Sequence, residues 1–291
     1  MKFETDIVVI DSGVDYSLLR NSNNITGIAV KKNDFQEHYI SDDIRDQIGH
    51  GTAVCSVIIK ESPSLRIFMI KLFDTFGSID LDDIIYALTY IKNNIKCKVI
   101  NMSFGVSYCE DISYFEKICK ELIQSGIIIV SAYDNLGTIS YPAFFDDVIG
   151  VDISLKDSSM DGYTFNDNSP VNITFHSSQQ LLPWKNGELK TVEGSSFYAP
   201  KISTMIAKKY PISDVWDYLK LNATNYRSFE RKNGDTNGID IKKAIVFPFN
   251  KEIRSISANE ELCNFDIVGY FDSKYTGNVG KQICSILNYT D

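Results

Sequence analysis

The sequence lacks the features that mark membrane proteins and nucleic-acid-binding proteins. No apolar run approaches the roughly 18 residues of a membrane-spanning helix, and the apolar stretch near the N-terminus is too short for the core of a signal peptide. The formal net charge is −9 over 291 residues, whereas a nucleic-acid-binding protein needs clustered Lys and Arg to neutralise phosphates. We therefore expect a cytoplasmic protein with no membrane and no nucleic-acid partner.

The six cysteines are scattered, and none forms the Cys-x-x-Cys spacing of a metal site. In a reducing cytoplasm we expect free thiols, several of them buried as small apolar residues. Cys55 follows His50 by five residues, which raises the alternative of a Cys–His nucleophile. His38 lies in a polar stretch and His176 follows a predicted strand, so we interpret both as structural or surface residues. The sequence shows no metal cluster and implies no cofactor.

Short apolar runs alternate with segments of helical periodicity over the first half of the chain. The apolar runs predict strands over residues 5–10, 66–72, 99–103, 127–130 and 148–153. Apolar residues at helical spacing predict amphipathic helices over residues 81–91 and 112–122. This alternation predicts an α/β fold, with a doubly wound, mostly parallel sheet and helices on both faces. A nucleotide-binding fold is disfavoured, because no Gly-x-Gly-x-x-Gly follows the first strand.

The length allows one large domain with a sizeable core. The pattern of strands and helices weakens beyond Phe247. We therefore predict a main domain over residues 1–247 and a C-terminal extension over residues 248–291 that packs on the same domain. We expect a monomer.

Three polar residues lie at or just beyond the ends of predicted strands. They are Asp11, Ser103 and Asn135. In doubly wound sheets the carboxyl ends of the strands form the ligand-binding edge. These side chains are therefore expected near one site.

Acyl transfer by a serine needs a nucleophile, a base, a carboxylate that orients the base, and donors to the oxyanion. Asp11 supplies a carboxylate at a strand end, and His50 lies between two glycines at a predicted helix start. Ser196 opens a second predicted helix, with Pro200 in its first turn. Asn135 supplies a side-chain donor. Each residue alone is more often a turn, cap or packing residue, so the inference depends on finding all four.

Five segments of the chain resemble, in order, the signatures of the subtilisin-like serine proteases, the subtilases. They are Asp11-Ser12-Gly13, His50-Gly51-Thr52, Asn101-Met102-Ser103-Phe104-Gly105, Asp134-Asn135, and Gly194-Ser195-Ser196 followed by Pro200. The resemblance covers roughly residues 5–210, and the order Asp, His, Ser is that of the family. It implies a subtilisin-like fold and a serine endopeptidase that works through an acyl-enzyme.

The resemblance implies a role for each matching residue. Ser196 is the nucleophile, His50 is the general base and then the acid for the leaving amine, and Asp11 orients His50. Asn135 and the backbone N–H of Ser196 form the oxyanion hole. Ser195 stands where the family has Thr, which retains a hydroxyl.

The resemblance also implies that the substrate is an extended peptide bound between two chain segments. These segments comprise Ser103, Phe104, Gly105, Gly77, Ser78 and Ile79. Tyr133 and Asp134 precede Asn135, in the stretch with which the family lines its S1 pocket. The family usually has Gly where this chain has Asp134. An acid there predicts selection of Lys or Arg at P1, and the alternative is that it caps a turn.

Only a few residues precede the first predicted strand. Short subtilases without export signals resemble the intracellular leader peptidases of lantibiotic clusters, which remove the leader from a modified precursor peptide. We therefore expect this chain to remove a leader from a precursor peptide, and the alternative is general intracellular protein turnover. Two other function classes stay open on the same fold. One is a catalytically silent peptide-binding module, and the other is a peptide ligase or macrocyclase.

Overall fold

The computed structural model describes most of the chain, and it divides the chain into two compact units, Met1–Glu230 and Arg231–Asp291. The described residues are 2–19, 22–74, 79–106, 112–134, 140–154, 162–169, 171–176, 178–228, 243–246 and 266–270. In the second unit β15 (Lys243–Val246) pairs in parallel with β16 (Asp266–Tyr270). The predicted boundary at residues 247 and 248 lies outside the described residues and stays a prediction.

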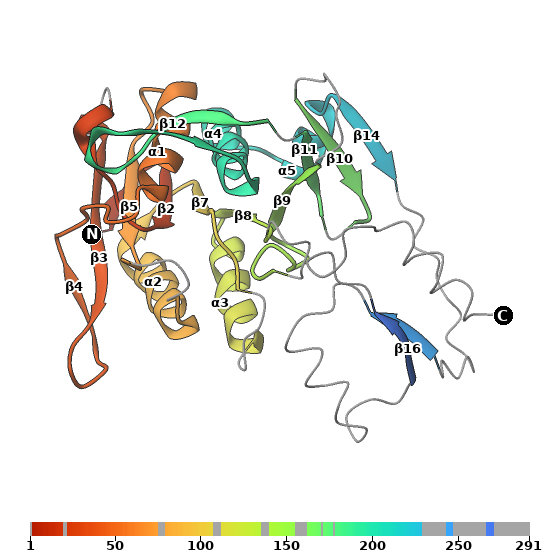
Figure 1. The fold of residues 1–291 in the computed structure, drawn as a ribbon, viewed down its shortest axis with the longest axis horizontal. Coiled ribbons are helices and arrows are strands. Elements are labelled where there is room, and N and C mark those ends of the chain that lie inside the picture. The colour runs from red at the N-terminus through yellow and green to blue at the C-terminus, as the bar shows by residue number, and fades with distance from the viewer. Residues whose placement is uncertain are drawn as a thin grey trace. The chain divides into compact units, whose positions relative to one another are not determined.

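One large sheet forms the centre of the first unit (Figure 1). Its strands, in spatial order, are β14 (Asn225–Ser228), β10 (Tyr163–Asp167), β11 (Ile173–His176), β9 (Ile149–Ser154), β8 (Ile128–Ala132), β7 (Val99–Met102), β2 (Ile7–Asp11), β5 (Ile67–Lys71), β3 (Ile25–Lys32) and β4 (His38–Ser41). Neighbours pair in parallel except β3 with β4 and β10 with β11. The predicted mostly parallel sheet is confirmed.

Helices cover both faces of this sheet, as the alternating pattern predicts. They are α1 (His50–Glu61), α2 (Leu81–Asn94), α3 (Ile112–Gln124), α4 (Ala199–Lys209) and α5 (Val215–Leu221). Figure 1 shows α1 and α4 on one side of the sheet and α2 and α3 on the other. Every helix among the described residues is too short or too polar to span a bilayer.

Strand β2 shows why the sheet has two cores. Successive side chains of a strand point to opposite faces. Val8 and Ile10 therefore pack in one apolar cluster with α2 and α3, while Ile7 and Val9 pack in the other with α4 and α5. All four are fully buried. A strand buried on both faces reads as a continuous apolar run, which is the pattern seen in the sequence.

The remaining short elements lie outside the large sheet. β1 (Phe3–Glu4) pairs in parallel with β6 (Ile95–Lys96), and β12 (Gln180–Pro183) pairs with β13 (Leu189–Val192) as an antiparallel hairpin. The 3₁₀ helices are η1 (Tyr16–Leu18), η2 (Ser22–Asn24), η3 (Lys185–Gly187) and η4 (Ser195–Phe197). Because β12 packs on α1, the hairpin covers the helix that begins at His50.

The helix predicted to open at Ser196 begins later than expected. Ser196 lies in η4, and α4 begins at Ala199 with Pro200 in its first turn. Pro suits a first turn because its missing N–H would have no partner there and its φ is already helical. The 3₁₀ turn therefore separates the candidate nucleophile from the regular helix.

Candidate active site

Two elements bring the predicted carboxylate and base together at the carboxyl edge of the sheet. Asp11 is the last residue of β2, and His50 is the first residue of α1. Nδ1 of His50 lies 2.8 Å from Oδ1 and 3.1 Å from Oδ2 of Asp11. A carboxylate accepts hydrogen bonds, so Nδ1 carries the proton and Nε2 is the acceptor nitrogen of the ring.

The Asp11–His50 pair is almost closed to solvent. Asp11 is fully buried, and the His50 side chain is 12% exposed. Oδ1 of Asp11 also accepts a 2.7 Å hydrogen bond from the backbone N–H of Ser12. The carboxylate is thereby held by two donors at the end of the strand, which fixes the ring that it orients.

Burial and nearby charges act on the pKa of His50 in opposite directions. Burial lowers it, because the imidazolium loses water. The charge of Asp11 and its hydrogen bond to the ring raise it, Asp46 raises it further, and Lys190 lowers it. The net effect places the pKa of His50 above its ordinary value. The charged ring is therefore stabilised, which is what a base that receives a proton requires.

Glycine at position 51 allows α1 to approach the turn after β2. A Cβ on Gly51 would lie 2.3 Å from the carbonyl oxygen of Gly13 and 3.2 Å from Cβ of Asp11. No side chain fits this space. The close contact sets the separation between the end of β2 and the first turn of α1, and hence between the two side chains of the pair.

Trp184 closes the other side of the start of α1. Gly49 caps the helix with a φ of 104°, in the left-handed region. Its missing side chain leaves room for the indole of Trp184, which a Cβ would meet at 2.4 Å. Nζ of Lys190 lies 4.3 Å from the Trp184 ring centroid. The sequence did not predict a role for Trp184 or Lys190, because no local pattern indicates that the β12–β13 hairpin packs on α1.

Ser196 lies half-buried in η4 and is followed by Phe197, which contacts the histidine. The ring of its neighbour Phe197 packs on the His50 ring at 5.3 Å between centroids. The carbonyl of Ser196 accepts a 2.8 Å hydrogen bond from Oγ of Ser103, and Oγ of Ser195 donates to the carbonyl of Tyr133 at 2.6 Å. The hydroxyls of Ser103 and Ser195 therefore link η4 to the segments that follow β7 and β8.

Asn101 extends the support of η4 into the core. Its Nδ2 donates to Oγ of Ser103 at 3.0 Å, and its Oδ1 accepts from Oγ of Ser203 in α4 at 2.9 Å. All three side chains are buried. The predicted substrate-segment residue Ser103 is thus also a structural link between β7 and the turn that carries Ser196.

The other predicted substrate residues occupy varied surroundings. Phe104 packs edge-on against Phe73, with ring centroids 6.1 Å apart, and Ile79 is half-buried against the same apolar cluster. A Cβ on Gly105 would meet Oγ of Ser140. Tyr133 is buried and Asp134 half-buried. Asn135, Gly77 and Ser78 lie outside the described residues, so their predicted roles stay predictions.

The structure argues against a cysteine nucleophile. Cys55 is fully buried, and burial raises the pKa of its thiol well above the ordinary value, with Asp11 and Asp46 raising it further. A buried, protonated thiol neither reaches a substrate nor attacks it. Cys97 and Cys119 are also free and buried, as predicted for structural thiols.

His38 has a structural partner of its own. Its Nε2 lies 2.8 Å from Oδ1 of Asp83, and its ring stacks on Tyr86 at 4.5 Å between centroids. His176 ends β11 and its carbonyl accepts a hydrogen bond from Tyr198. Among the described residues, no group of three or more His, Cys, Asp or Glu side chains is placed to hold a metal ion.

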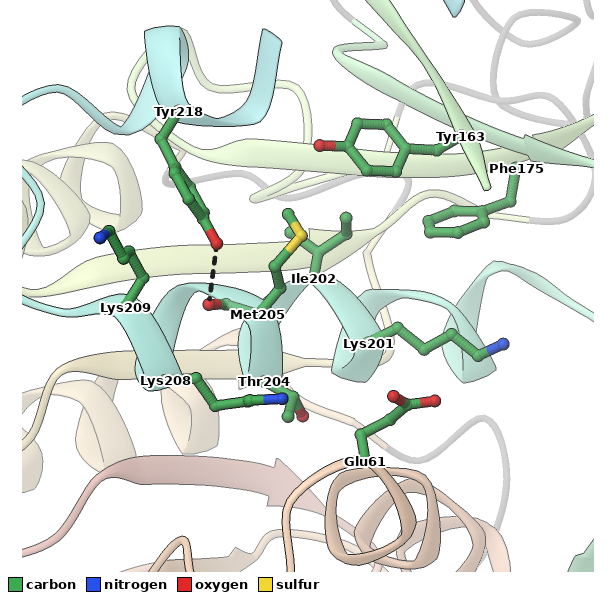
Figure 2. A pocket seen from close by; sticks show the side chains of 10 residues that line it. All are labelled: Glu61, Tyr163, Phe175, Lys201, Ile202, Thr204, Met205, Lys208, Lys209 and Tyr218. Atoms are coloured by element: carbon green, nitrogen blue, oxygen red, sulfur yellow. Dashed lines mark hydrogen bonds between the residues drawn. The ribbon is translucent and has the colours of Figure 1, made fainter. Parts of the chain in front are cut away.

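A pocket of about 410 Å³ lies along α4 and outside this constellation. Its lining residues are Glu61, Tyr163, Phe175, Lys201, Ile202, Thr204, Met205, Lys208, Lys209 and Tyr218. Figure 2 shows Glu61 projecting from α1 toward Lys201 and Lys208 of α4, with the apolar side chains on the far side of these lysines. Glu61 and Lys209 end their helices, whereas His50 begins α1. Because this lining contains neither the candidate base nor the candidate nucleophile, the pocket is separate from the catalytic chemistry.

Comparison with known proteins tests the family resemblance that the sequence shows. Residues 4–237 match the model of the Subtilase family. The chain belongs to the subtilase family. Asp11 and His50, which hydrogen-bond to each other, both lie within the matched region. The subtilases are the subtilisin-like serine endopeptidases, so the sequence resemblance is confirmed.

A subtilisin-like protease of Arabidopsis thaliana, SBT6.1, is 33% identical over 125 residues. That match spans 38% of this subtilase and only 12% of the plant protein. The chain therefore corresponds to a small part of that relative's length.

Two solved structures have the same fold at low sequence identity. A cold-adapted subtilisin-like serine proteinase is 22% identical with a TM-score of 0.61, over 81% of this chain and 86% of that one. The epidermin leader peptide processing serine protease of Staphylococcus aureus is 16% identical with a TM-score of 0.56, over 75% and 68%. The predicted subtilisin-like fold is confirmed.

The raised pKa of His50 predicts a pH dependence. A general base must be neutral to accept a proton, so kcat/KM should fall as the pH drops through the pKa of His50. Because that pKa lies above the ordinary 6.5, the midpoint of the acid limb should also lie above 6.5. Initial rates on a neutral peptide substrate between pH 5 and 9, at constant ionic strength, measure it. An acid limb centred below 6.5 would contradict the described electrostatics.

Proposed function

We propose that this chain is a serine endopeptidase that uses Asp11, His50 and Ser196 as a catalytic triad. The observation that carries the proposal is the buried hydrogen-bonded pair of Asp11 and His50, with Phe197 of η4 packed on the imidazole. Ser196 is next to Phe197, in a turn held by Ser103. Membership of the subtilase family supports the same roles.

In the proposed reaction, Oγ of Ser196 attacks the scissile carbonyl carbon while Nε2 of His50 takes the hydroxyl proton. Asp11 keeps Nδ1 protonated and stabilises the imidazolium. His50 then gives the proton to the leaving amine, so the C–N bond breaks and an acyl-enzyme forms. Water, deprotonated by His50, hydrolyses the ester. The backbone N–H of Ser196 and the side chain of Asn135 are the proposed donors to the oxyanion.

The proposed substrate is an extended peptide that runs between the segment of Ser103, Phe104 and Gly105 and the segment of Gly77, Ser78 and Ile79. We propose that the natural reaction removes the leader from a modified precursor peptide in the cytoplasm, by a monomeric enzyme. The fold similarity to the epidermin leader peptide processing protease supports this biology. General protein turnover is the competing proposal.

Acidic side chains near the proposed S1 pocket favour a basic P1 residue. Burial raises the pKa of Asp152 in β9, and the charge of Asp134 raises it further. The negative charge of Asp134 therefore opposes ionisation of Asp152. A Lys or Arg side chain placed between them would relieve this unfavourable interaction through charge-assisted hydrogen bonds.

Ser196→Ala should abolish proteolysis, with a loss of about 10⁶-fold in kcat for removal of a triad serine in this family. The assay incubates the chain with a precursor peptide bearing a leader and with an unrelated unfolded protein, and identifies the products by mass spectrometry. A linear product carrying one added water supports the peptidase. Cyclic or transpeptidated products would indicate a ligase, and no product from folded protein would indicate a binding module. Equal cleavage of the unrelated protein would favour turnover over leader removal.

Asp134→Asn should weaken a preference for Lys or Arg at P1 by about tenfold, with little change for apolar P1 residues. The expected effect follows from losing one charge-assisted contact of about 1.5 kcal/mol. Cleavage of a P1 peptide library measures the ratio, and Asp147→Asn is the matched control, because Asp147 is an exposed carboxylate elsewhere. A library profile without basic preference, or one unchanged in Asp134→Asn, would contradict the proposal.

A further inference from the structure

Asp46 is a buried carboxylate four residues before His50, and among the described residues its hydrogen-bond donors all belong to the framework of the site. Asp46 is only 6% exposed. Oδ1 accepts from Oγ of Ser12 at 2.9 Å and from the backbone N–H groups of Ile48 and Gly49 at 2.9 and 2.7 Å. Oδ2 accepts from the backbone N–H and Oγ1 of Thr52 at 2.9 and 2.7 Å. Five donors surround one carboxylate.

This arrangement gives α1 a cap that Gly49 has no side chain to supply. The first turn of a helix has N–H groups without intrahelical acceptors and carries partial positive charge. Asp46 accepts from Gly49 at the cap position and from Thr52 in the first turn. Burial opposes ionisation of Asp46, but these hydrogen bonds hold its pKa below the ordinary value. It is therefore charged at neutral pH.

Ser12 connects this cap to the catalytic strand. Its hydroxyl donates to Oδ1 of Asp46 and accepts from the backbone N–H of Gly51 at 2.9 Å. Ser12 follows Asp11, and Gly51 follows His50. One buried carboxylate and one hydroxyl thus join the residues that flank the two members of the pair.

We infer that Asp46, acting through Ser12 and the first turn of α1, is a positioning residue that holds His50 against Asp11. The inference rests on the proposed peptidase function and deepens it. Asp46 is not a catalytic residue, because among the described residues its carboxylate contacts Ser12, Ile48, Gly49 and Thr52 rather than the reacting groups.

The charges around His50 mean that the role of Asp46 can be tested through the pH dependence of activity. The pKa of His50 is affected by the charges of Asp11 in β2, Asp46 in the loop before α1, and Lys190 in β13. Cys55, on α1 itself, is a neutral thiol, and η4 presents the uncharged ring of Phe197. Asp46 and Lys190 shift the pKa of His50 in opposite directions. Removing one or the other should therefore move the acid limb of activity in opposite directions.

The test compares Asp46→Asn with Lys190→Ala and Asp43→Asn. Asp46→Asn removes the charge and turns an NH₂ group toward N–H donors, so kcat should fall by up to about 10²-fold for a misplacement on the order of 1 Å. KM should change little, and the acid limb should move to lower pH. Lys190→Ala should move the limb to higher pH. Asp43, a half-buried carboxylate paired with Arg45 in the same loop, is the control whose loss should change neither.

A simple structural cap gives a different result. Asp46→Asn would then lower the melting temperature while kcat per folded molecule and the acid limb stayed at wild-type values, and that outcome would overturn the inference. Should Asp46→Asn fail to fold, Ser12→Ala replaces it. That variant keeps the charge of Asp46 and removes the bridge, so kcat should fall, and an unchanged kcat would overturn the inference.

A second readout separates this inference from the proposed function. The His50 ring is titrated by NMR in Ser196→Ala, with and without Asp46→Asn, which requires no turnover. A lower titration midpoint with Asp46→Asn supports the inference even if wild-type protein cleaves no peptide. An identical midpoint would overturn it even if the wild-type protein is an active peptidase.

Discussion

The contact between the turn after β2 and the first turn of α1 is the constraint on which the site depends. Gly51 leaves no space for a side chain against the carbonyl of Gly13, so the strand and helix meet at one separation. That separation puts Nδ1 of His50 2.8 Å from the Asp11 carboxylate. A shift of about an ångström would lose the hydrogen bond, and with it the orientation of the base.

The large sheet and its two cores make this contact rigid. β2 lies between β5 and β7, and its apolar side chains are buried in clusters on both faces. The end of β2 therefore has little freedom to move. The helix start is fixed by polar contacts instead: Asp46 accepts from its N–H groups, and Trp184 packs over Gly49. Apolar burial positions Asp11, and hydrogen bonding positions His50.

The sequence predicted the sheet, its helices and the Asp11–His50 pair, because periodicity and short motifs are local signals. The start of α4 was misplaced, since Pro200 in the first turn of α4 suits a helix that starts at Ala199 as well as one that starts slightly earlier. The role of Asp46 was missed because it depends on Ser12, which lies 34 residues away along the chain. An acid just before a helix is a recognisable cap signal, and it was the one available clue. The contribution of Trp184 depends on space above Gly49, which no local pattern encodes.

The central claim is that Asp11, His50 and Ser196 form an assembled triad in the folded protein. Covalent labelling with a fluorophosphonate, read by intact mass and peptide mapping, tests it most directly, because only an activated serine reacts readily. We expect one label per chain, on Ser196, with loss of labelling in Ser196→Ala and in His50→Ala. Folded wild-type protein that takes no label, or takes it on another residue, would contradict the account.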